Sequence, residues 1–115
     1  MGYKFYTFAL LAIEEIYKTI KGTVLASLPG ANVLLFGSRA KGTEDSQSDY
    51  DLMVITKQLF TQKEKMDWCC KMHKSIVKAI HAPVDLLLFS EDEIKQKREL
   101  PGHIVRSAIN EGVYL

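Results

Sequence analysis

The sequence predicts an α/β fold in which a small mixed sheet packs against helices. Three short apolar runs have the length and composition of strands, at residues 33–36, 52–55 and 84–89. Two longer segments, residues 4–21 and 61–80, carry apolar residues at helical spacing. Strands that alternate with helices are typical of one sheet covered by helices. A chain of 115 residues with 47% hydrophobic residues can bury one ordinary core, so we expect a single domain over residues 1–115.

The first helix is expected over residues 4–21, with Ile13, Ile16 and Ile20 on one face and Gly22 as its end. The apolar run 5–13 is too short to cross a bilayer and continues into charged residues, so we expect an amphipathic helix without a membrane role. The two cysteines, Cys69 and Cys70, are adjacent, which disfavours a disulfide between them and fits a cytoplasmic protein.

The central part of the chain predicts two strands joined by a polar loop. Pro29 and Gly30 form a turn, and the strand 33–36 then ends at Gly37. A loop over residues 41–48 leads to a second strand over residues 49–55. Because side chains alternate along a strand, Asp49 and Asp51 should share one face.

The C-terminal half predicts a helix, a strand, two further helices and a short final strand. Thr61 with Glu64, and Ser90 with Glu93, have the spacing of capping boxes that begin helices. The strand 84–89 is so apolar that we expect it inside the sheet rather than at an exposed edge. The last helix should end at Gly112, before a strand over residues 113–115, and His73 is expected to be a hydrogen-bonded core histidine.

Three aspartates on the expected strands indicate a site for divalent cations. If Asp49 and Asp51 lie about 5 Å apart, their repulsion is about 3 kcal/mol at an effective dielectric constant near 20. Asp85 lies within a strand that is expected to be buried, where an unpaired charge costs several kcal/mol more. Magnesium prefers carboxylate oxygens and completes its coordination with water and phosphates, so the three aspartates suit two Mg²⁺ ions.

Gly37 and Ser38 predict the phosphate-binding part of the same site. The glycine lets a phosphate approach the backbone, and the hydroxyl of Ser38 follows where a helix is expected to begin. Arg39 and Lys41 can add positive charge to the phosphate oxygens. The 15 basic and 14 acidic residues nearly balance, so we do not expect general nucleic-acid binding.

Together the segments GSRAKG, SDYDLMV and PVDLLLF resemble the DNA polymerase β-like nucleotidyltransferase superfamily, and most closely its minimal, MntA-like branch. The resemblance implies a polymerase β-like fold, ATP as substrate and two Mg²⁺ ions. It also implies that Ser38 contacts the triphosphate and that Asp49 and Asp51 bind both metals. Asp85 would then bind metal and activate the acceptor hydroxyl.

The acceptor is expected to come from another molecule, because the chain has no room for a second, substrate-binding domain. The resemblance implies a partner HEPN toxin that receives AMP on a tyrosine, with this chain as its antitoxin. Two alternatives remain: transfer of a nucleotide to a small hydroxyl compound such as an aminoglycoside, and an antitoxin that neutralises its partner by binding without catalysis.

Overall fold

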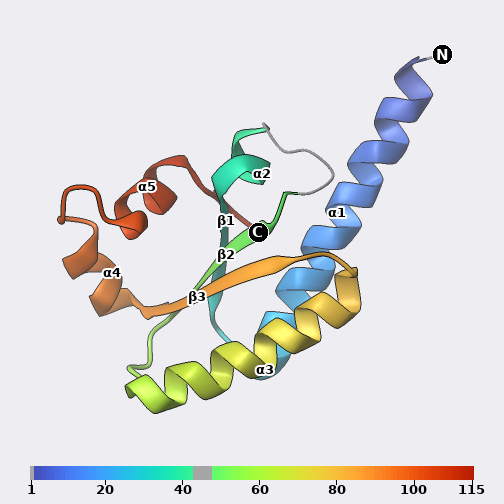
Figure 1. Ribbon diagram of the computed structural model, residues 1–115. Coiled ribbons are helices and arrows are strands. Elements are labelled where there is room, and N and C mark those ends of the chain that lie inside the picture. Colours follow the sequence, from blue (N-terminus) through green and yellow to red (C-terminus); the bar gives the residue numbers. More distant parts are fainter. Residues whose placement is uncertain (1, 43–47) are drawn as a thin grey trace.

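A computed structural model describes residues 2–42 and 48–115, with side chains from residue 10 onward. Four strands form one sheet in the order β3-β2-β1-β4 (Figure 1). The elements follow in the order α1 (Gly2–Ser27), β1 (Asn32–Phe36), α2 (Gly37–Lys41), β2 (Tyr50–Thr56), α3 (Gln62–Ile80), β3 (Val84–Ser90), α4 (Glu91–Lys97), α5 (Ile104–Glu111) and β4 (Val113–Tyr114).

The sheet is mixed, as the sequence predicts. Strand β1 is antiparallel to both β2 and β4, whereas β2 and β3 are parallel. The parallel pair needs a crossover connection, and α3 provides it. These observations confirm the predicted fold class.

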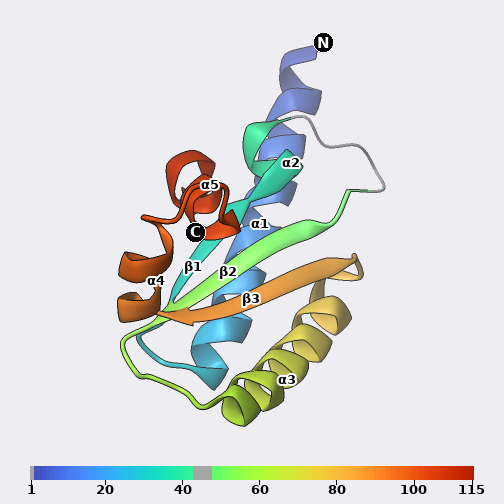
Figure 2. The ribbon, with the colours of Figure 1, turned by 60° about the vertical axis from the view of Figure 1, so that its left-hand side comes forward.

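Helices cover both faces of the sheet (Figure 2). On one face, α1 and α3 pack through a core that includes Ile20, Val24, Met72 and Ile76. On the other face, α4 and α5 contribute a second core cluster. Successive residues of a strand point to opposite faces, so a fully covered strand is apolar throughout. The two cores therefore explain the continuous apolar runs in the sequence.

The predicted capping boxes are confirmed at the starts of α3 and α4. Thr61 accepts a hydrogen bond from the Glu64 amide at 3.2 Å, and Ser90 accepts one from the Glu93 amide at 3.1 Å. Helix α5 ends before Gly112, and β4 adds the expected short strand beside β1. The starts of α3 and α4 and the end of α5 are therefore readable from local sequence, whereas α4 ends at Lys97, before the end expected near Leu100.

The first helix departs from the prediction at both ends. It does not end at Gly22 but continues to Ser27, because the buried side chains of Val24 and Leu28 extend its apolar face over the sheet. Its N-terminal half extends away from the sheet (Figure 1), and Ile13 on the predicted apolar face is 39% exposed. None of the helices in the described residues has both the length and the hydrophobicity that a membrane span requires.

The prediction that residues 84–89 form an interior strand is wrong, because β3 lies at the edge of the sheet. Its side chains still meet apolar groups on both faces: Leu86 and Leu88 join the first core, and Leu87 and Phe89 pack against the second. The apolar composition of β3 indicates that both of its faces are covered. It does not indicate whether a further strand pairs with the outer edge of β3.

Candidate active site

Gly37 brings the end of β1 against the carboxylate of Asp51. Phe36 and Asp51 are partners in the antiparallel pair of β1 and β2, and the chain turns at Gly37 with φ of 74°. A Cβ atom at Gly37 would lie 2.1 Å from Oδ2 of Asp51, which is far inside van der Waals contact. Only glycine fits this close approach, so the Gly-Ser motif and the Asp-x-Asp motif meet at this point.

The parallel pairing of β2 and β3 places Asp51 beside Asp85, since the two residues are direct partners in the register. Asp49 lies two residues before Asp51, just outside the strand. Burial raises the pKa of the Asp51 carboxyl above its usual value, and the negative charges of Asp85 and Asp49 raise it further. Both of the other predicted aspartates therefore act electrostatically on Asp51.

The expected burial cost at Asp85 needs correction. Asp85 is exposed, and so is Asp49, whereas Asp51 between them is partly buried. Asp85 is the exposed residue of β3, next to the buried Val84, so its charge carries no large burial cost. Repulsion among the carboxylates, together with the partial burial of Asp51, is the physical basis of the site.

The carboxylates form an open arrangement. Within residues 2–42 and 48–115, no three Asp, Glu, His or Cys side chains form a group that could hold a metal ion. Such a closed group is typical of structural metal sites, whereas Mg²⁺ is usually bound by one or two carboxylates together with water and substrate phosphates. Acidic oxygens that repel one another on one face of a sheet fit a magnesium ion that arrives with a nucleotide.

Ser38 is the second residue of α2 and directly follows the close contact between Gly37 and Asp51. It is partly buried, and the Gly42 amide donates a hydrogen bond to its carbonyl oxygen at the end of the helix. The short helix thus fixes the backbone of Ser38 directly after the residue that contacts Asp51.

Arg39 binds the start of β2. Its guanidinium donates two hydrogen bonds to the carbonyl oxygen of Ser48, at 3.1 and 2.9 Å, and its Cζ lies 3.9 Å from the centre of the Tyr50 ring. These contacts tie α2 to the residues on either side of Asp49. Arg39 therefore supports the geometry of the site, whatever its contact with phosphate.

Lys41 forms an ion pair with Glu111 of α5, with Nζ 2.9 Å from Oε2. Both side chains are about half exposed, so the pair contributes little to stability. The predicted loop over residues 41–48 lies largely outside the described residues, because it includes residues 43–47.

His73 differs in part from its prediction. It is hydrogen-bonded, as expected, because its Nε2 lies 2.9 Å from the carbonyl oxygen of Val84. It is exposed, however, and the buried residues of α3 are Met72 and Ile76. The core face of α3 runs through Met72 and Ile76, so the neighbouring His73 lies beside the core and reaches the edge of β3 directly before Asp85.

Comparison with known proteins gives the family. Residues 29–112 match the family "Polymerase beta, Nucleotidyltransferase". A candidate protein adenylyltransferase of Methanocaldococcus jannaschii is 39% identical over 57 residues, which make up 48% of this chain and 58% of the relative. The matched segment thus spans little more than half of that relative's length.

Two solved structures share the fold. A toxin–antitoxin structure with AMP-PNP superposes with a TM-score of 0.61 at 18% identity, covering 85% of this chain and 70% of that one. A variant of the MntA–HpeT toxin–antitoxin pair superposes with a TM-score of 0.59 at 15% identity, again covering 85% and 70%.

The family match covers all seven of the predicted site residues, from Gly37 to Asp85. It agrees with the fold, in which a mixed sheet brings Gly37 against Asp51. The resemblance seen in the sequence is therefore confirmed, and the chain belongs to the polymerase β family of nucleotidyltransferases.

Proposed function

We propose that this chain transfers AMP from ATP to a hydroxyl group of another protein, with magnesium bound by Asp49, Asp51 and Asp85. The observation that carries the proposal is the meeting of two motifs. Asp51 is paired in register with Asp85 and lies so close to Gly37 that a Cβ atom would not fit. A phosphate at the Gly-Ser turn would therefore lie beside the carboxylates that bind its metal.

The proposed reaction is an attack of the acceptor hydroxyl oxygen on the α-phosphorus of ATP. A bond forms between that oxygen and phosphorus, the bond from phosphorus to the bridging oxygen breaks, and pyrophosphate leaves with its electron pair. Bound magnesium would neutralise the triphosphate and lower the pKa of the hydroxyl. Asp49, Asp51 and Asp85 would hold the metal ions together with the phosphates of the nucleotide. Asp85, on the neighbouring strand, would also accept the hydroxyl proton.

The residues of α2 would position the triphosphate. The space that a side chain at Gly37 would need is filled by the Asp51 carboxylate, so the glycine brings this carboxylate against the turn. The Ser38 hydroxyl, which follows the turn, would donate a hydrogen bond to a phosphate oxygen. Arg39 and Lys41 are proposed to supply positive charge. For Lys41 this requires its exposed ion pair with Glu111 to open, which costs little.

The proposed acceptor is a tyrosine of a partner HEPN-type toxin, with this chain as its antitoxin. Support comes from the relative that is a candidate protein adenylyltransferase, and from two neighbours in fold that are toxin–antitoxin structures. The described part of the chain forms one sheet with its covering helices, without a separate substrate domain. An acceptor hydroxyl presented by a partner fits this architecture.

The test is a transfer assay with purified protein, Mg²⁺, ATP labelled at the α-phosphate and a helical partner protein encoded by the neighbouring gene. We expect label on the partner and release of pyrophosphate. Asp51→Asn should abolish transfer, whereas Asp67→Asn, an exposed carboxylate of α3, should retain it. Absence of label on any protein would refute the proposal, and full neutralisation of the toxin by Asp51→Asn would favour a binding antitoxin.

A further inference from the structure

The outer edge of β3 presents backbone groups that alternate with those bonded to β2. The Tyr50 amide donates to the carbonyl oxygen of Pro83 at 3.0 Å, and Tyr50 is paired with Val84. In a parallel pair with this register, the odd-numbered residues of β3 bond to β2. The even-numbered residues, Val84, Leu86, Leu88 and Ser90, therefore point their amide and carbonyl groups outward.

Side chains occupy both ends of this edge. At one end His73 Nε2 lies 2.9 Å from the carbonyl oxygen of Val84. At the other end the Ser90 amide donates to Oε1 of Glu93 at 3.1 Å, and Lys65 pairs with the other oxygen of that carboxylate. These contacts limit strand pairing at the two ends.

The middle of the edge remains open. In the described part of the chain, no group hydrogen-bonds the outward amides and carbonyls of Leu86 and Leu88. Backbone groups of this kind strongly favour a partner, and in a sheet edge the matching partner is another extended backbone. The open stretch has room for a few residues of an added strand.

A groove between α3 and β3 runs along the same edge. It consists of two hollows of about 400 and 290 Å³, which share Cys69 and Leu86 as lining residues. The larger is lined by apolar groups that include Met66 and Phe89, and the smaller reaches Asp85. The groove therefore leads from an apolar surface to a residue of the candidate active site.

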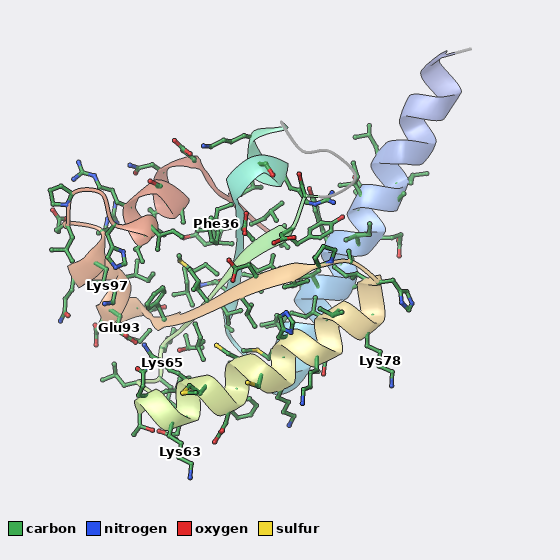
Figure 3. All side chains as sticks on the ribbon, in the orientation of Figure 1. Phe36, Lys63, Lys65, Lys78, Glu93 and Lys97 are labelled. Carbon is green, nitrogen blue, oxygen red and sulfur yellow. The ribbon has the colours of Figure 1, made fainter. Side chains whose placement is uncertain are left out.

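Figure 3 shows the directions of three lysine side chains of α3. Lys63 and Lys78 point away from the sheet, whereas Lys65 points toward Glu93. Lys65 is largely buried in that ion pair and lies 5.1 Å from the centre of the Phe89 ring. The wall that α3 contributes to the larger hollow combines the apolar Met66 and Cys69 with Gln62 and the paired Lys65.

We propose that this groove binds an extended segment of the acceptor protein, which adds to β3 as a short strand. Its backbone would bond to Leu86 and Leu88, alternate apolar side chains would enter the groove beside Cys69, and a hydroxyl-bearing residue would reach Asp85. The inference rests on the proposed function, for which it names the mode of acceptor recognition.

The position of Asp85 favours an acceptor segment over a second copy of this chain. A second copy paired along β3 would cover a carboxylate of the candidate site, whereas an acceptor must approach that carboxylate. A small molecule would be poorly matched, because the two outward residues lie two positions apart, about 6.6 Å along the strand.

The test is amide hydrogen exchange measured by NMR, without nucleotide or metal. In the free protein Leu86 and Leu88 should exchange faster than Leu87 and Phe89, whose amides face β2. The probe is the blocked peptide Thr-Val-Thr-Tyr-Thr-Val-Thr at millimolar concentration. It should slow exchange at Leu86 and Leu88 by about tenfold or more, because new backbone hydrogen bonds form there.

Two controls define the binding mode. Two further peptides of the same sequence carry methylated backbone amides, one on its odd-numbered and one on its even-numbered residues. The peptide whose methylated amides face β3 should fail to protect Leu86 and Leu88. The variant Leu86→Pro removes an outward donor, which an edge strand tolerates, so it should lose peptide protection while Mg²⁺ and ATP still raise its melting temperature.

Unchanged exchange at Leu86 and Leu88 with peptide would overturn the docking proposal, even if AMP transfer is observed. Protection that grows with protein concentration in the absence of peptide would also overturn it, in favour of a second copy at the edge. Failure of AMP transfer with normal peptide protection would instead count against the proposed function alone.

Discussion

Replacement of Gly37 by alanine tests the contact that joins the two motifs. The new Cβ atom would lie 2.1 Å from Oδ2, 3.0 Å from Cγ and 3.3 Å from Cβ of Asp51. Rotation of the carboxylate alone does not relieve a contact that reaches Cγ, so the Asp51 side chain must move or β1 must separate from β2. Either change displaces a proposed metal ligand.

Gly42→Ala is a matched control, because Gly42 has the same φ of 74° and no described atom lies within 4 Å of the position that a Cβ atom would take there. The positive φ costs an alanine about 1–2 kcal/mol at either site. Both variants should therefore lose stability in thermal unfolding. Only Gly37→Ala should also lose AMP transfer, by about 100-fold or more, equivalent to about 2.7 kcal/mol.

The pair of variants separates backbone strain from displacement of Asp51. Turnover should be measured at saturating ATP and Mg²⁺, at a temperature where both variants are folded. If Gly37→Ala retained turnover within threefold of Gly42→Ala, the close contact would have no role in the chemistry, and the argument from the two motifs would fail.

Three further predictions follow from the described contacts. The pKa of Asp51 is raised in the folded state, so ionisation of this carboxyl destabilises the metal-free protein above that pKa, and the cost is relieved as pH falls through the pKa. Asp51→Asn should therefore raise the melting temperature at pH 7 without metal. It should also make the melting temperature less dependent on pH in the acidic range. An unchanged melting temperature would count against the carboxylate repulsion. Lys65→Met leaves the partly buried Glu93 without its partner and should cost about 1–3 kcal/mol in urea unfolding, whereas Lys63→Met, on the exposed side of the same helix, should change stability by less than about 0.5 kcal/mol. Equal losses would show that the ion pair is not important. Arg39→Lys keeps the charge but loses the pair of hydrogen bonds to Ser48 and the contact with the Tyr50 ring. AMP transfer should therefore fall even where ATP binding, measured by calorimetry, is retained. Unchanged transfer would show that Arg39 contributes only its positive charge.

Much of the fold can be predicted from the sequence because its signals are local. The capping boxes at Thr61 and Ser90 fix where two helices begin, and the short apolar runs fix three strands. Gly22 shows the limit of this reasoning, because glycine favours a helix end but the buried faces of Val24 and Leu28 continue the helix. Tertiary packing outweighs a modest propensity cost of about 1 kcal/mol.

The lateral order of strands could not be predicted, because composition reports burial of the two faces alone. For that reason β3 was expected inside the sheet, and Asp85 was expected to be buried. The clustering of the three aspartates was expected from their places on two strands, but the direct pairing of Asp51 with Asp85 follows from the strand register, which the sequence does not specify.

The positions of Arg39, Lys41 and His73 depend on contacts that have no sequence pattern. The partners of these side chains, Ser48, Glu111 and Val84, come from distant parts of the chain or from a loop end. A basic residue after a Gly-Ser pair predicts charge near phosphate. It does not predict which carbonyl, ring or carboxylate the side chain contacts in the folded chain.

The most direct test of the central claim is a crystal structure with Mg²⁺ and a non-hydrolysable ATP analogue. We predict metal ions at about 2.1 Å from carboxylate oxygens of Asp49 and Asp51, with the triphosphate against Gly37 and Ser38. A nucleotide bound elsewhere on the chain, or one bound here without Asp51 as a metal ligand, would contradict the proposed site.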